Sequence, residues 1–378
     1  MFPRSPPQKW GCQLRIEELT KVAACKAERR RSRFVSVAGG LVLAAGIAWG
    51  GHAVAQDNNT QIDGLNADLR GSLYNAGTSL VAKLDLAQLG HDQLLQAVHG
   101  LFEPDEYALF VATSTDFDAQ LDQYLTPTKA SAALVALDYR TLTAVVLQGA
   151  VPFAALLLGT NVDDTTFAAA QLGIQGALSL VGLPTDITKR GDYALIGNAN
   201  TPLPKLPHIQ SIEDAILLGL QQPTGTPAVT FVSPVDDSLR VQIASSGASA
   251  PELATAIGQA DYIGGYLVTG PNPQVHVYVR YGSEEKAGSV KALYDQAWQQ
   301  AVAEADKEDA DSNASDTKDV PYISTGEMTR RIAAAMPVTV FNGIVKLDLD
   351  TVALRQITGA VVDRYFRVPP NSDGAGAN

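Results

Sequence analysis

Apolar and polar residues alternate most regularly in two stretches, 262–269 and 274–281. A period of two is typical of a half-buried β-strand, and the residues between the stretches (Gly270-Pro-Asn-Pro273) are turn formers, so the pattern predicts a β-hairpin. A second hairpin is predicted where Val338–Phe341 and Ile344–Leu347 flank Asn342-Gly343, because Asn-Gly favours the tight turn between antiparallel strands.

Helical spacing of apolar residues predicts most of the remaining elements. Ser211 with Asp214 and Ser324 with Glu327 have the spacing of a capping box, and Ser283 stands before the longest such stretch. The predicted helices cover Asp116–Leu125, Phe167–Val181, Ser211–Gln221, Pro251–Gln259, Glu284 to about Ala305, Ser324 to about Ala335 and about Thr351–Tyr365. Further strands are predicted at Tyr107–Thr113, Asp192–Gly197, Ala228–Val232 and Leu239–Ala244.

One short pattern recurs three times, as an apolar run that ends in Leu-Asp and is followed by apolar residues at helical spacing. It occurs at Val81–Leu89, Leu134–Leu142 and Ile344–Val352. We interpret it as a strand followed by a helix, with Asp85, Asp138 and Asp348 placed to accept hydrogen bonds from helix N-terminal amides. Coincidence among Ala- and Leu-rich segments is the alternative. The expected fold class is α+β, with repeated strand–helix units on a mainly antiparallel sheet after an N-terminal export helix.

The N-terminal part has the order of a secretory signal peptide. A basic block at 29–33 precedes the uncharged apolar stretch Phe34–Gly51, and the small residues Ala53 and Ala55 follow. We expect cleavage after Ala55, which makes Gln56 the first residue of the mature chain. An uncleaved anchor is the alternative, since 34–55 is long enough to span a bilayer and the arginines obey the positive-inside rule.

Composition along the chain suggests its organisation. Residues 1–33 form a basic region, which we interpret as a disordered tail or as the result of a start codon assigned too far upstream, and 34–55 is the export segment. An α+β body is expected at 56–303, an acidic disordered loop at 304–319, a helix–hairpin–helix part of the same body at 320–367, and a disordered tail at 368–378. A boundary between two domains at the acidic loop is the alternative.

Charge and cysteine content narrow the possible functions. The net charge is −12 over 378 residues, and the first 55 residues carry +6, so the remainder carries −18. Such an acidic body argues against nucleic acid as a partner, because phosphate binding needs clustered Lys and Arg. Cys12 and Cys25, the two cysteines, both precede the apolar stretch, so a cleaved chain has neither disulfides nor thiolate chemistry.

Candidate chemical motifs are weak. Ser283 and Lys286 have Ser-x-x-Lys spacing without the accompanying motifs of serine acyl-enzymes, and Asp309–Asn313 lacks the glycine and glutamate of a calcium loop. The histidines His91, His99, His208 and His276 lack ligand spacing, and His276 is expected at an exposed or satisfied strand position. The acidic pairs Asp163-Asp164 and Asp236-Asp237 are expected to cap turns or helices. We therefore assign no catalytic residue, metal ligand or cofactor.

Four tyrosines on the first predicted hairpin offer a possible binding surface. These are Tyr262, Tyr266, Tyr278 and Tyr281, which could present an aromatic surface to a sugar or a protein partner. Tyrosines that cover a sheet face are the structural alternative.

One stretch resembles a known class of proteins. Thr230–Asp237, the strands around Gly264-Gly265 and Val275–Val279, and the long helix after Ser283 are similar to uncharacterised exported proteins of planctomycete-type bacteria. The resemblance implies export and α+β character only.

The sequence therefore predicts an exported protein of the periplasm or cell envelope, most simply a non-enzymatic binding or structural protein whose partner or ligand is unknown. Contact with the membrane is expected only through 34–55, if that segment is not cleaved. An envelope-polymer hydrolase is the alternative, with a site assembled from scattered Ser, His and Asp residues.

Overall fold

The computed structural model describes residues 67–102, 123, 125–138, 153–159, 162–180, 185–198, 207–223, 225–246, 250–312 and 323–365. The basic region, the expected export segment with its cleavage site, the predicted strand at Tyr107–Thr113 and the C-terminal tail lie outside these residues, as does nearly all of the predicted helix Asp116–Leu125.

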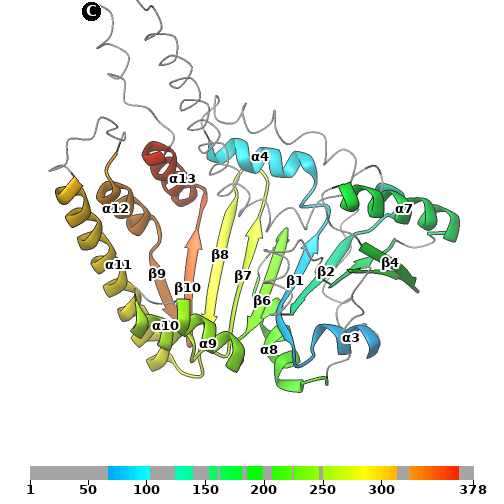
Figure 1. Ribbon diagram of the computed structural model, residues 1–378, viewed down its shortest axis with the longest axis horizontal. Coiled ribbons are helices and arrows are strands. Elements are labelled where there is room, and N and C mark those ends of the chain that lie inside the picture. Colours follow the sequence, from blue (N-terminus) through cyan, green and yellow to red (C-terminus); the bar gives the residue numbers. More distant parts are fainter. Residues whose placement is uncertain are drawn as a thin grey trace, which may run out of the picture. The chain divides into compact units, whose positions relative to one another are not determined.

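The described strands form one ten-stranded antiparallel sheet (Figure 1), which confirms the predicted α+β class. Its spatial order is β4-β5-β3-β2-β1-β6-β7-β8-β10-β9. The first five strands are β1 (Thr78–Asp85), β2 (Ala132–Asp138), β3 (Phe153–Leu157), β4 (Thr185–Arg190) and β5 (Tyr193–Asn198). The other five are β6 (Val229–Pro234), β7 (Tyr262–Val268), β8 (Gln274–Arg280), β9 (Val338–Phe341) and β10 (Ile344–Leu349).

Helices connect these strands. In chain order, those described are α3 (Ala67–Leu73), α4 (His91–Leu101), the 3-10 turn η1 (Thr126–Thr128), α7 (Asp164–Leu180), α8 (Gln210–Leu220), α9 (Asp237–Ser246), α10 (Pro251–Ile257), α11 (Glu284–Ser312), α12 (Thr325–Ala335) and α13 (Thr351–Tyr365). Both predicted hairpins are confirmed as β7–β8 and β9–β10. Asn342 and Gly343 have φ angles of 51° and 72°, as the tight turn between β9 and β10 requires.

Strands β1 to β5 correspond, in sequence order, to strands β6 to β10. With this correspondence, the spatial order of the strands is the same when it is read from either edge of the sheet. We call 78–198 the first half and 229–349 the second half. In each half the first three strands lie side by side from the centre outward, and the fifth strand lies inside the fourth. A helix precedes the first strand of each half, α3 and α8, and α7 and α11 both connect the third strand to the fourth.

The hydrogen-bond register of the two halves is also the same. The pair Leu80–Leu137 between β1 and β2 corresponds to Val229–Leu267 between β6 and β7. The correspondence continues outward through the other strand pairs of both halves. Under it, Ala82 corresponds to Phe231, and these two residues face each other across β1 and β6. An approximate two-fold axis therefore passes between them, normal to the sheet.

Backbone hydrogen bonds beyond the strand ends repeat as well. The N–H of Leu86 donates to Ser131 O at 3.1 Å, and the N–H of Val235 donates to Asp261 O at 3.2 Å. The N–H of Leu158 donates to Asp192 O, and that of Tyr281 donates to Gly343 O, both at 2.8 Å. This agreement, across strands and connections, indicates that the chain contains two copies of one structural unit.

This duplication is not the repeat that the sequence predicts. The three Leu-Asp segments form β1, β2 and β10, which are the first, second and fifth strands of their halves and do not correspond to one another. Asp85 accepts hydrogen bonds from the N–H groups of Ala87 and Gln88, but these residues form a turn before α4 begins at His91, so the helix-capping role predicted for Asp85 is wrong. The cap of α13 is Asp350, which accepts the N–H of Ala353, so the role predicted for Asp348 is wrong.

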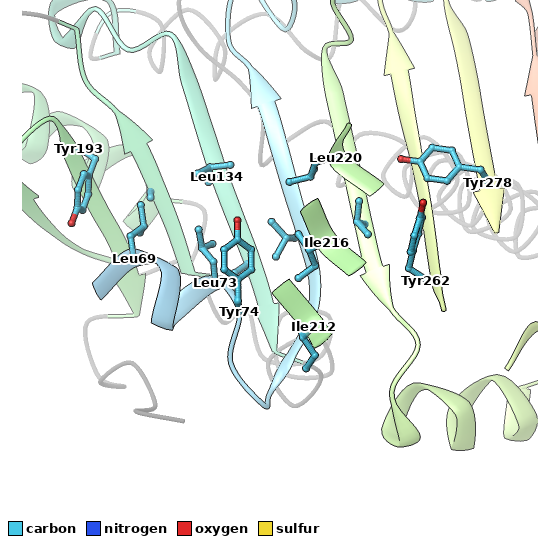
Figure 2. Close-up of a cluster of buried hydrophobic side chains, with 14 of the residues drawn as sticks. Leu69, Leu73, Tyr74, Leu134, Tyr193, Ile212, Ile216, Leu220, Tyr262 and Tyr278 are labelled. Atoms are coloured by element: carbon cyan, nitrogen blue, oxygen red, sulfur yellow. The ribbon is translucent and has the colours of Figure 1, made fainter. Parts of the chain in front are cut away.

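Apolar side chains cover both faces of the sheet. On one face, α3 and α8 bury a core that extends across both halves, from Leu69, Leu134 and Tyr193 to Ile216, Tyr262 and Tyr278 (Figure 2). On the opposite face, α7 packs over the first half through Phe167 and Ile174, and α11 packs over the second half through Ala287 and Val290. We call the face under α3 and α8 the α8 face.

Two sequence predictions fail in the connections of the second half. The segment Leu239–Ala244 was expected to be a strand but lies in α9, because Asp236 accepts the N–H of Leu239 at 2.8 Å and starts a helix there. Val241 is 69% exposed, so the apolar alternation does not correspond to burial.

The expected acidic disordered loop is helical over Glu304–Ser312, as the last part of α11. Asp306 pairs with Arg330 at 2.5 Å, and Asp309 accepts the N–H groups of Thr325 and Gly326 at the start of α12. These partners are distant in sequence, and they make the acidic residues part of a helical packing. Residues 313–322 lie outside the described residues.

Candidate functional site

The register of the sheet places five side chains in one line across the α8 face. Lys83 pairs with Thr230, Thr230 with Tyr266, Tyr266 with His276 and His276 with Asp348, on β1, β6, β7, β8 and β10. Directly paired residues of antiparallel strands point to the same face, so their side chains are neighbours. We call these five residues the polar row.

His276 is the centre of the polar row. Its Nδ1 lies 2.6 Å from Asp348 Oδ1, and its Nε2 lies 3.2 Å from Gln274 Oε1. The Tyr266 ring stacks on the imidazole with centroids 4.3 Å apart and planes inclined by 20°. Two oxygen partners and a stacked ring fix the orientation of the imidazole. The side chain of His276 is 18% exposed and that of Asp348 is 56% exposed, so the pair opens toward solvent on the Asp348 side.

The first half provides an internal comparison for this site. The residues that correspond to Tyr266, His276 and Asp348 are Ala136, Phe153 and Gly197. None of the three can form an ion pair or a side-chain hydrogen bond. The same strand register is thus built without the polar side chains, so the fold itself does not require them.

The tyrosine surface expected from the sequence is not formed. Tyr262, Tyr278 and Tyr281 are 2%, 3% and 1% exposed, so this prediction is wrong for three of the four residues. Tyr262 and Tyr278 meet edge to face under α8, where the Tyr278 hydroxyl donates to Gly219 O at 2.8 Å (Figure 2). Burial raises the pKa of Tyr278 and of Tyr281. Tyr266 is the member of the set that contributes to the polar row.

The other histidines differ in their surroundings. His208 Nε2 lies 2.8 Å from Glu213 Oε2 at the start of α8. The capping box predicted for Ser211 and Asp214 is wrong, because α8 begins at Gln210 and its N-cap residue Ile209 makes no side-chain hydrogen bond. His99 lies on α4, and the side chain of His91 is not among those described. In the described part of the chain, neither His208 nor His276 hydrogen-bonds a serine. The geometry at these two residues therefore provides no activated nucleophile of the kind the hydrolase alternative needs.

The acidic pairs cap local structure, as expected. Asp163 accepts the N–H of Thr166 at 2.8 Å, and this hydrogen bond lowers the pKa of Asp163. Asp236 has the same role at α9, and Ser283 accepts the N–H of Lys286 at 3.3 Å at α11. The predicted cap of α12 is also confirmed, since Ser324 accepts the N–H of Glu327.

The His276–Asp348 pair was missed in the sequence because the two residues are 72 positions apart. Alternation places each on a strand face, but only the pairing of β8 with β10 brings them together. The available signal was that each residue takes a polar position in the alternation of its strand, between apolar neighbours.

Among the residues that the structure describes, no group of three or more His, Cys, Asp or Glu side chains could hold a metal ion. Within the same residues, no helix is long and apolar enough to cross a membrane. No family model, curated protein or solved structure matches the chain.

Proposed function

We propose that this protein is exported to the bacterial cell envelope, where it acts by binding glycan strands through the polar row, four of whose five residues belong to its second half. Export is supported by the basic block, the apolar stretch and the Ala53–Ala55 site, and by the absence of cysteine after Cys25. The observation that carries the binding role is the presence of Tyr266, His276 and Asp348 in one half and of Ala, Phe and Gly in the other.

The chemistry of the polar row suits a glycan ligand. Asp348 and Gln274 offer oxygen acceptors to sugar hydroxyls, and the stacked Tyr266–His276 pair adds ring edges on a flat sheet face. Lys346 lies on the same face, beside Asp348 on β10 and opposite Tyr278. Few but well-fixed polar groups on a rigid element are typical of binding sites.

The export part is tested by expressing the full chain in a bacterium, separating the envelope fractions and sequencing the N-terminus. We expect a periplasmic or envelope-associated product that begins at Gln56. A product that keeps residues 1–55 and stays in the cytoplasm would contradict export.

The binding part is tested by co-sedimentation of the purified protein with peptidoglycan sacculi. We expect the double variant H276A/D348N to lower the bound fraction about tenfold. The matched control is His208→Asn, which disrupts the other histidine–carboxylate pair, and it should bind as the unmodified protein does. Thermal unfolding of each variant verifies folding. Unchanged binding by the folded double variant, or no binding by the unmodified protein, would refute this role.

A further inference from the structure

A polar hollow lies where α4 of the first half meets the β7–β8 turn of the second half and α13, the helix that follows the second half. Figure 1 shows α4 and α13 beside the same end of β7 and β8. The hollow has a volume of about 360 Å³, within the range of small-molecule sites. Its lining includes Asp92, Leu95, Gln96 and His99 on α4, Pro271 on the turn and Arg355 on α13.

Hydrogen bonds hold the walls of this hollow together, and two of them join the two halves. The N–H of Gly270 donates to Gln93 O at 3.2 Å, and the Thr269 hydroxyl donates to Gln88 O at 2.5 Å. The Thr351 hydroxyl, at the start of α13, donates to Pro273 O at 3.0 Å. Three separate chain segments are thus fixed around one space.

Gly100 allows the end of α4 to lie close to the β7–β8 turn. A Cβ atom at this position would lie 3.2 Å from Pro271 O, tighter than an ordinary contact. The small residue lets the end of α4 lie directly against the turn, and the carbonyl of Gly100 accepts a hydrogen bond from Arg355 Nε. The Arg355 side chain is thereby anchored through one nitrogen.

The charges that line the hollow do not neutralise each other. Within the described residues, neither Arg355 nor Asp92 forms an ion pair, although both line the same space. The bond to Gly100 uses Nε, so the two terminal nitrogens of Arg355 remain available for a carboxylate. Asp92, in the first turn of α4, is exposed and can accept from an ammonium group.

We propose that this hollow binds a free α-amino acid or the zwitterionic end of a short peptide. The carboxylate pairs with Arg355, the ammonium group pairs with Asp92, and the side chain lies against Leu95 and Pro271. This ligand class follows from the opposite charges of Arg355 and Asp92, which line one hollow without pairing with each other, so that a zwitterion engages both whereas a singly charged ligand engages one. The site is separate from the polar row and does not depend on glycan binding.

The test is calorimetric titration of the full-length protein with glycine, alanine, leucine, acetate and methylammonium. We expect the amino acids to bind and the two singly charged probes to bind at least tenfold more weakly. Leucine should bind more tightly than glycine if its side chain lies on Leu95 and Pro271. Absence of binding by all three amino acids, or acetate binding as tight as alanine binding, would overturn the proposal.

Variants distinguish the two charged contacts. Arg355→Gln should weaken alanine binding at least tenfold, and Asp92→Asn should weaken alanine binding but leave acetate binding unchanged. Gln356→Ala, on an exposed neighbour of Arg355, is the matched control and should bind as the unmodified protein does. Alanine binding that survives Arg355→Gln would contradict the assignment, whether or not sacculus binding is observed.

Discussion

The two halves of the sheet have the same strand order and register but fill it with different side chains. In the first half, Leu134 on β2 lies opposite Ala155 on β3. At the corresponding place in the second half, Gly264 on β7 lies opposite Tyr278 on β8. The larger residue of the pair lies on the second strand in the first half and on the third strand in the second half. In both halves the pair fills the space between the sheet and the helix. A duplicated fold can thus keep its register when corresponding core positions hold different residues, provided that the core between the sheet and its helices stays filled.

The halves also differ in the connection between their third and fourth strands. In the first half, α7 has 17 residues and four residues connect it to β4. In the second half, α11 has 29 residues, and α12 is inserted before β9. Arg331 of α12 contacts Asp363 of α13 at 3.1 Å, so the inserted helix also supports the helix that carries Arg355. The second half therefore carries four of the five residues of the polar row, and its inserted helix contacts α13, which lines the hollow together with α4 of the first half.

The largest effect on stability is expected from replacing Gly264 with the leucine that occupies the corresponding position, 134, in the first half. A Cβ atom there would lie 2.3 Å from the ring of Tyr278, which is buried and held by its bond to Gly219 O. We expect Gly264→Leu to lower the free energy of unfolding by about 3 kcal/mol or more, because this core cannot accept the added volume. Chemical denaturation followed by circular dichroism measures the loss.

The double variant G264L/Y278A tests whether the halves are truly equivalent. It copies the Leu–Ala arrangement of β2 and β3, so the two changes should compensate by about 1–3 kcal/mol relative to the sum of the single variants. Additive losses would show that the second-half core does not accept the packing of the first half.

The sequence was sufficient for elements whose signals are local. The Asn342-Gly343 hairpin, the Ser324 cap and the helix after Ser283 depend on residues within a few positions of each other, and all three were predicted. The duplication was not predicted from the sequence, because the two halves share the spacing and burial of their residues rather than most residue identities, as Gly264 and Leu134 illustrate. A pattern of identical letters such as Leu-Asp was misleading for the same reason.

Predictions also failed where distant contacts override a local pattern. The period-two alternation of Leu239, Val241 and Ile243 indicates a strand, but Asp236 caps a helix there. Glu304–Ser312 has the composition of a solvated loop, but Arg330 and the start of α12 provide partners for Asp306 and Asp309. The candidate site belongs to this class, since Tyr266, His276 and Asp348 become neighbours only through strand pairing.

The two edge hairpins provide a smaller and closely matched comparison. Gly343 has φ 72°, and a Cβ atom on it would lie 2.9 Å from Tyr281 O. Gly191, in the β4–β5 turn, has φ 60° with nothing within 4 Å of such an atom. We expect Gly191→Ala to cost about 1 kcal/mol, for the left-handed conformation alone, and Gly343→Ala to cost about 2 kcal/mol or more. Urea denaturation of both variants measures the difference, and equal losses would contradict the steric argument.

The smallest expected effect concerns the helix found only in the second half. Asp309 of α11 accepts the N–H groups of Thr325 and Gly326 at 3.0 and 2.7 Å, and so caps α12 from outside. Partial burial favours the neutral acid, but the Ser324 hydroxyl and these two amides outweigh it and lower the pKa of Asp309 below 3.8.

A lowered pKa means that the folded state prefers the charged carboxylate. The stabilisation is therefore present above the pKa of an unfolded aspartate, about 3.9, and is lost as the pH falls through the lower folded value. We expect Asp309→Asn to cost about 1 kcal/mol at pH 7 and less near pH 2, so that its unfolding free energy falls less steeply with acid. Urea denaturation at pH 7, 4 and 2 tests this, with Asp311→Asn on the same helix as the control. A loss that is the same at all three pH values would mean that the charge of Asp309 does not hold α12 in place.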